Sequence, residues 1–153
     1  MTERLSYIVT GAPDLIARAS LHLETRGRGI VEFTSDAADF LVRSRAGDGA
    51  VTAYLRHTSA SLIIQENADP DVKRDLMTAL ARLAPDDAGW VHDTEGPDDM
   101  PAHVKAALTG ISLHVPVAEG RMMLGAWQGL YLVEHRTRPH RREIVLQFVG
   151  GRR

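Results

Sequence analysis

The sequence predicts an α+β fold, with a mainly antiparallel, β-sandwich-like sheet and two central helices. Strand-like segments lie towards both ends of the chain, and helix-like segments cluster near its middle. The regular alternation of strands and helices that marks a doubly wound parallel sheet is missing. At 153 residues the chain has the size of one domain. Residues 1–153 are therefore expected to form a single domain.

The first third of the chain is expected to contain short strands separated by turns. Residues 5–10 have strand character, and the sequence of residues 11–14, Gly-Ala-Pro-Asp, is typical of a turn. Apolar and polar side chains alternate over residues 20–25, which is the period of a half-buried strand. Residues 30–34 suggest another short strand. A helix should follow, capped by Ser35 or Asp36 and stopped by Gly47 and Gly49.

The two central helices carry clear boundary signals. Asp69 is a good N-cap, and Pro70 stands at the first helical position, where its missing N–H costs nothing. This helix should end at Pro85. A further helix is expected from Met100 to Leu108, with Asp99 as its cap.

The remaining periodic segments are predicted to be strands. Two lie before and after the His57 segment, and the final third of the chain is expected to be entirely β-structure. These strands are residues 50–56, 62–64, 112–116, 121–124, 129–134 and 143–149.

Composition limits the partners and the compartment. A net charge of −2 gives no strong general attraction to nucleic acid. No apolar run approaches the roughly 20 residues that span a bilayer, so no membrane partner is expected. The first residues lack the apolar stretch of a signal peptide, and a cytoplasmic location is expected. Because the chain has no cysteine, a metal site would have to use histidines and carboxylates.

The segment from His92 to His103 is rich in groups that bind metals. Asp99 and His103 are four residues apart and would share one face of a helix. His92 could fold back towards them, and His57 could supply a third imidazole from a strand end. Three imidazoles and a water would form an open, zinc-type site. A purely structural interpretation stays open, in which Asp99 only caps the helix, His103 is solvated and His57 bonds to strand ends.

Two other groups of residues allow two interpretations each. Trp127, in a glycine-rich turn, could cover an edge of the core or stack on a flat heterocycle, with Gln128 giving directional hydrogen bonds. Four arginines near the C-terminus, interleaved with two histidines, could bind phosphate or lie in solvent. They are Arg136, Arg138, Arg141 and Arg142, with His135 and His140.

Four segments, in this order, resemble the signature of the YjbQ family. They are His57–Leu62 (HTSASL), Glu66–Pro70 (ENADP), Glu95–His103 (EGPDDMPAH) and Leu124–Gly129 (LGAWQG). The likeness runs over roughly residues 20–150, so that residues 1–19 are expected to be an N-terminal extension. Ala126 stands where the family pattern would have threonine, and His92 follows Trp90 and Val91 rather than a tyrosine-rich approach.

The resemblance implies a fold, an assembly and an activity. The fold is α+β with a sandwich-like sheet, assembled as a homotrimer, with a cleft that binds a metal near the histidines. The activity is a weak, secondary thiamine-phosphate synthase reaction, which joins an aminopyrimidine diphosphate to a thiazole phosphate and releases diphosphate. The family's primary role is not settled.

Site roles follow as a hypothesis. The metal is zinc, with Mg²⁺ or another divalent ion as the alternative, and its ligands are His57, His92 and His103. Asp99 orients His103 or acts as acid and base, and Glu95 is a second carboxylate candidate. Ser59, Ser61 and Arg142 hold the phosphate of a small phosphorylated molecule, while Trp127 and Gln128 shape the pocket. Two alternatives are a metal-dependent hydrolase of a small phosphorylated or amide substrate, and a non-catalytic regulatory module that binds a small ligand.

Overall fold

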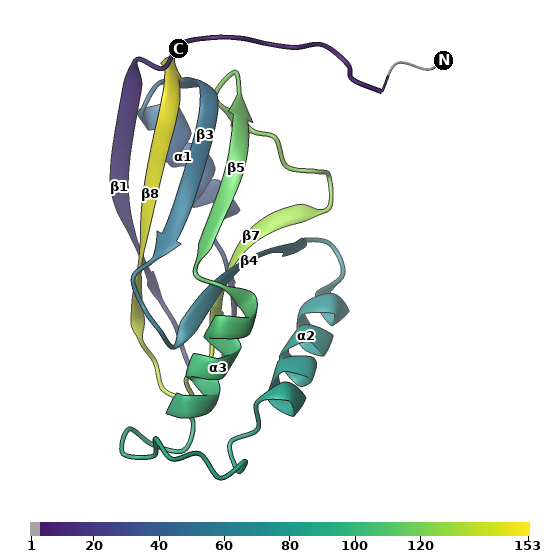
Figure 1. Cartoon of the computed structure of the whole chain (residues 1–153), viewed down its shortest axis with the longest axis vertical. Helices are drawn as coiled ribbons and strands as arrows, with labels where there is room; N and C mark the ends of the chain where they lie inside the picture. The colour runs from purple at the N-terminus through teal and green to yellow at the C-terminus, as the bar shows by residue number, and fades with distance from the viewer. Residues whose placement is uncertain (1–3) are drawn as a thin grey trace.

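The computed structural model describes residues 4–153 and contains two antiparallel sheets and three helices (Figure 1). The larger sheet has five strands, in the spatial order β1 (Leu15–Glu24), β8 (Arg141–Arg152), β3 (Ala46–Leu55), β5 (Ser112–Ala118) and β6 (Arg121–Met122). The smaller sheet has three, in the order β2 (Gly29–Glu32), β7 (Gln128–Glu134) and β4 (Ala60–Glu66). The helices are α1 (Thr34–Arg43), α2 (Pro70–Leu83) and α3 (Asp99–Thr109). The predicted α+β class with mainly antiparallel sheets is confirmed.

One hydrophobic core joins the two sheets and α1. In the smaller sheet Leu62 pairs with Leu132, and both side chains are fully buried. From the larger sheet Phe148 reaches the same core, and Phe40 reaches it from α1. Alternate residues of β8 are buried, the pattern of strands with one face on a core. No helix in the part of the chain that the structure describes has the length and apolar character needed to span a bilayer.

The central helices begin where local signals place them, with one shift. Asp69 caps α2 as expected, because its Oδ1 accepts a hydrogen bond from the Asp71 N–H at 2.9 Å. In α3 the N-cap is Asp98, and Asp99 is the first helical residue. The prediction that Asp99 caps the helix is therefore wrong, and its carboxylate is free for other contacts.

Three further predictions from the sequence need correction. The helix α1 begins at Thr34 and has no side-chain cap from Ser35 or Asp36. Gly47 and Gly49 lie inside β3 instead of stopping the helix. Residues 5–10 form no strand and the following tetrapeptide forms no turn; both belong to an extended arm that leads into β1 (Figure 1). A strand requires a hydrogen-bonded neighbour, and none of the described strands pairs with residues 5–10.

Candidate metal centre

The long loop before α3 and the first turns of that helix bring three potential ligands together. Asp99 and His103 share one face of α3, and His92 folds back from the loop. The Oδ2 atom of Asp99 lies 2.7 Å from Nε2 of His92 and 3.1 Å from Nε2 of His103. One ligand atom from each residue lies within 4.8 Å of the other two. The expected approach of His92 to the helix is thus present in the structure.

The hydrogen bond to Thr58 decides which ring nitrogen of His103 can bind a cation. Nδ1 of His103 lies 2.7 Å from the carbonyl oxygen of Thr58, which can only accept, so that Nδ1 carries the hydrogen. In the neutral ring Nε2 then has a lone pair and no hydrogen, and it faces Oδ2 of Asp99 at 3.1 Å. Two acceptors repel unless a proton or a metal ion lies between them. A backbone carbonyl that holds the second ring nitrogen is typical of metal-bound histidines.

Arg136 orients the carboxylate of Asp99. Its Nη1 donates to Oδ1 of Asp99 at 2.7 Å, which leaves Oδ2 for the two histidines. The same guanidinium donates to Oδ2 of Asp98 at 3.0 Å and to the carbonyl oxygen of Glu95 at 2.9 Å. Three donors therefore fix the start of α3 against the loop that follows β7.

Asp99 is ionised although it is almost fully buried. Burial alone would raise the pKa of this carboxyl, but the hydrogen bond from His92 and the positive charge of Arg136 help to outweigh it, and the pKa lies below its usual value. Burial would also raise the pKa of Asp98, but hydrogen bonds from the N–H of Thr137 and from Arg136 outweigh it, and the pKa of Asp98 is lowered. Both groups carry their negative charge at neutral pH, as metal ligation by Asp99 would require.

The two histidines differ from Asp99 in exposure. The side chain of Asp99 is 6% exposed, whereas that of His92 is 42% exposed and that of His103 is 31% exposed. The cluster therefore has a buried anionic base and an open side. Ligands with bonds of 2.0–2.2 Å around a tetrahedral ion lie about 3.3 Å apart, so the observed spacing needs little expansion to hold zinc. Two imidazoles favour zinc or another transition metal over Mg²⁺, which prefers oxygen ligands.

His57 lies outside this cluster. Its Nε2 accepts a hydrogen bond from the backbone N–H of Glu143 at 2.8 Å, and Nη1 of Arg142 lies 3.5 Å from its Nδ1. Burial, and after it the charge of Arg142, lowers the pKa of His57. A cation at Nε2 would have to displace the backbone N–H, and one at Nδ1 would meet the positive charge of Arg142. The group that lies beside His92 and His103, and that could hold a metal with them, is thus the carboxylate of Asp99 instead of a third imidazole.

Three predicted phosphate-binding residues lie in buried networks. Arg142 is 3% exposed and forms an ion pair with Glu134, with Nη2 of Arg142 also donating to Oγ of Ser59 at 3.0 Å. Burial acts to raise the pKa of Glu134, but the hydrogen bond from Arg142 outweighs it and the pKa is lowered. Ser61 is fully buried, with Oγ 2.8 Å from Nε2 of His135. Each of the three side chains is hydrogen-bonded to another buried group, and the charge of Arg142 is already balanced by Glu134.

Trp127 and Gln128 lie at the far end of the smaller sheet from the histidines. In the β4–β7 register Glu66 is opposite Gln128, whereas Ala60, next to the His57 segment, is opposite Glu134. Six residues of strand separate the two ends, about 20 Å. Trp127 is 65% exposed, and the side-chain oxygen of Gln128 accepts the N–H of Gly125 at 2.9 Å. Within one chain these residues do not join the cluster.

Glu95 contributes only its backbone carbonyl to the cluster, and its side chain is exposed. Two other residues of the site, Arg136 and Thr58, were not predicted from the sequence. Arg136 belongs to the arginine group that was considered for phosphate binding, and a pairing with Asp99 across 37 positions has no local signal. Thr58 acts through its carbonyl oxygen, which every residue type has.

Comparison with known proteins places the chain in a family. The family model described as "UPF0047 protein YjbQ-like" matches residues 19–151. The UPF0047 protein sll1880 of Synechocystis is 49% identical over 131 residues, which cover 85% of this chain and 89% of that protein. UPF0047 protein YjbQ of Escherichia coli is 39% identical over 132 residues, which cover 86% and 96% of the two chains.

Solved structures agree with the fold. A protein of the yjbq/upf0047 family from Clostridium acetobutylicum superposes with a TM-score of 0.79 at 31% identity, covering 85% of this chain and 98% of its own. The conserved hypothetical protein TT1486 from Thermus thermophilus gives a TM-score of 0.77 at 34% identity, with coverage of 85% and 98%. The family match covers all strands and helices described above except the first four residues of β1 and the last residue of β8. The chain belongs to the YjbQ (UPF0047) family.

Proposed function

We propose that the chain binds a divalent transition-metal ion, zinc in the first instance, through His92, Asp99 and His103. The observation that carries this proposal is the approach of Nε2 of His103 to Oδ2 of Asp99 at 3.1 Å, while Nδ1 of the same ring is bonded to Thr58. A bound cation satisfies both acceptors at once. Two histidines and one carboxylate with an open side form the ligand set of catalytic zinc sites.

The family resemblance extends the proposal to a reaction. We propose weak, secondary thiamine-phosphate synthase activity, in which an aminopyrimidine diphosphate and a thiazole phosphate are joined. A cation at the cluster would supply positive charge for the departing diphosphate. The chain's own contribution is to hold that position: Thr58 orients His103, and Arg136 orients Asp99. A small phosphorylated substrate, a homotrimeric assembly and a cytoplasmic location remain predictions from sequence.

Elemental analysis of the purified protein tests the metal site. We expect near-stoichiometric divalent metal in the wild type and its loss in Asp99→Asn and His103→Ala. His114→Ala is the matched control, because His114 is an exposed histidine on β5 that bonds only to Thr52. An equal metal content in all four proteins, or none under any loading condition, would remove the assignment. Circular dichroism of each variant separates loss of metal from loss of fold.

Product analysis separates the synthase from its main rival. A hydrolase is favoured by the same observation, because two histidines and a carboxylate with an open side also suit metal-activated water. The synthase requires both substrates and forms thiamine phosphate, whereas a hydrolase consumes one substrate alone. Binding of either substrate without turnover would instead indicate a regulatory module. In each case Asp99→Asn should abolish the reaction that the wild type performs.

A further inference from the structure

The N-terminal arm, residues 4–13, exposes apolar side chains that a chain end in water would not be expected to carry. Four of them stand mostly in solvent: Leu5 (64% exposed), Tyr7 (79%), Ile8 (72%) and Val9 (64%). In an extended strand Leu5, Tyr7 and Val9 would share one face, and Ser6, Ile8 and Thr10 would share the other, on which Ile8 is the one apolar residue. The backbone is extended but pairs with no strand among the described residues.

The arm is held away from its own chain. At its root the N–H of Asp14 donates to the carbonyl of Gly150 at 2.9 Å, and Oδ1 of Asp14 accepts the N–H of Arg152 at 2.7 Å. These bonds direct the arm across the end of the five-stranded sheet, away from the free edge of β1 (Figure 1). Pro13 favours extended backbone at Ala12, so the chain does not turn back there.

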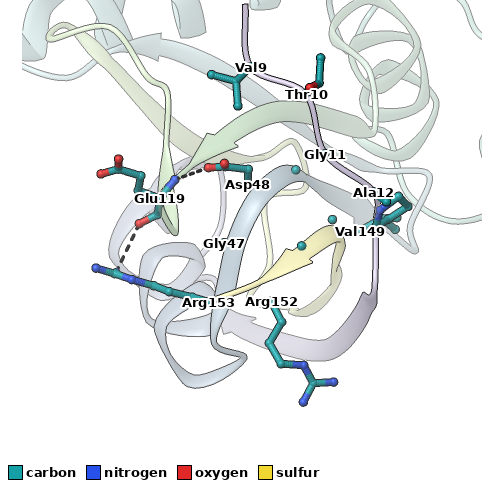
Figure 2. Close-up of a pocket in the computed structure, with 14 residues that line it drawn as sticks. Val9, Thr10, Gly11, Ala12, Gly47, Asp48, Glu119, Val149, Arg152 and Arg153 are labelled. Carbon is teal, nitrogen blue, oxygen red and sulfur yellow. Dashed lines mark hydrogen bonds between the residues drawn. The ribbon is translucent and has the colours of Figure 1, made fainter.

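A cavity separates the arm from the sheet below it. Figure 2 shows Val9, Thr10 and Ala12 on one side of this space. On the other side are Gly47, at the start of β3, and Arg152, at the end of β8. Its volume is about 680 Å³. Leu5, Tyr7 and Ile8 are not among the residues that line this space, and each is mostly exposed.

The outer edge of β1 is the complementary surface. This strand of ten residues stands at the edge of the sheet and pairs only with β8 among the described strands. Beneath the edge, between β1 and α1, lies a groove of about 460 Å³. Leu21, Phe40 and Leu146 give it an apolar part, and the charged side chains of Arg18, Asp36, Asp39 and Arg43 also line it. An unpaired edge beside an open groove is a ready template for an added strand.

We propose that the arm of one copy of this chain adds as an extra strand to the outer edge of β1 in a second copy. Leu5, Tyr7 and Val9 then point into the groove between β1 and α1, where the phenol of Tyr7 suits the mixed apolar and polar walls. The free strand and the free edge belong to the same chain, so each copy can give its arm to one neighbour and receive an arm from another, which also closes in a ring of copies. The arm lies outside the part of the chain that the family model matches, residues 19–151.

Disulfide trapping tests the proposal directly, because the chain has no cysteine of its own. Val9→Cys protein is mixed with separately purified, tagged protein carrying Ala17→Cys or Ala19→Cys, whose side chains are on the groove side of β1. Mild oxidation should give a cross-linked dimer of the two proteins. Ser20→Cys, on the opposite face of β1, and Ala81→Cys, exposed on α2, are matched controls and should cross-link little.

Tyr7→Asp in the Val9→Cys protein should remove the cross-link, because it places a carboxylate in the groove, while the exposed position leaves the fold unchanged. The proposal is overturned if all four β1 and α2 positions cross-link equally or not at all. It is also overturned if a chain carrying both Val9→Cys and Ala19→Cys forms only a disulfide within itself, which would show a hairpin on its own β1. None of these outcomes depends on the metal content or the activity of the protein.

Discussion

At the scale of single residues, the buried polar groups are structural supports of the candidate centre. Arg142 lies beside His57 and Ser59, and its charge is matched by Glu134, which is fully buried. A buried pair of this kind adds little net stability, but loss of one partner leaves an uncompensated charge. The carboxylate and the guanidinium therefore have to be tested together.

Arg142→Met should destabilise the fold by about 3–5 kcal/mol, because Glu134 is left charged in the core. The double variant Arg142→Met/Glu134→Gln should recover part of this loss, because Gln removes the unbalanced charge and keeps an acceptor for Thr25 or the N–H of Arg136. Chemical denaturation measures both free energies of unfolding. If the single variant unfolds like the wild type, then Arg142 is not a structural residue, and phosphate binding by its guanidinium becomes open again.

His135 should make stability depend on pH. Burial, and after it the charge of Lys105, lowers the pKa of His135 from 6.5 to about 4. Between these values the unfolded chain binds a proton that the folded chain does not, so stability falls as pH decreases through this window. From pH 7 to pH 5 the expected loss is about 2 kcal/mol.

The comparison with His135→Asn isolates this effect from the carboxylates, which titrate in both proteins. Urea unfolding at pH 7 and pH 5 should show a smaller loss in the variant than in the wild type. Equal losses would mean that the ring of His135 is also protonated in the folded state. Its Nδ1, which has no protein partner among the described residues, would then donate a hydrogen bond to a water molecule.

At the scale of elements, local signals predicted what local contacts determine. The start of α2 was predicted correctly because Asp69 and Pro70 act within one helical turn. The cap of α3 was misplaced by one residue because Asp98 and Asp99 are chemically alike, and Arg136, from a distant loop, binds both. The strand predicted at residues 5–10 is absent from the structure, because the sequence of one segment does not show whether a neighbouring strand exists to pair with it.

The same distinction explains the candidate centre. Their spacing of four residues predicted that Asp99 and His103 share one face of a helix, and the structure shows this contact. The exclusion of His57 depends on the N–H of Glu143, which is 86 positions away. Contacts of this range follow from sheet register, which a single sequence does not encode in any short motif.

Asp69→Ala should destabilise the protein by about 1 kcal/mol, because the Asp71 N–H loses its acceptor at the start of α2. Asp75→Ala is the control: it removes an exposed carboxylate from the middle of the same helix and should change stability by less than about 0.5 kcal/mol. Thermal and urea unfolding measure both. Equal effects of the two substitutions would show that the loss of charge, and not of the cap, is responsible.

At the scale of the whole molecule, the candidate centre joins segments that are distant in sequence. Thr58 precedes β4, His92 belongs to the loop before α3, and Arg136 follows β7. A cation held by this cluster can form its full set of bonds only when all of these segments are in place. Metal binding should therefore be coupled to global folding.

Zinc should raise the melting temperature of the intact protein. A ligand that binds only the folded state at 100 times its Kd adds about 2.7 kcal/mol of stability. For a chain of this size about 1 kcal/mol shifts the midpoint by 2–4 °C, so a rise of roughly 5–10 °C is expected. Thermal unfolding with zinc and with a chelator measures it. His114→Ala should show the full rise and Asp99→Asn almost none, because the buried carboxylate is the anionic ligand to which both histidines converge. An equal rise in both variants would place the zinc elsewhere on the molecule, and no rise in the wild type would argue against a folded-state site.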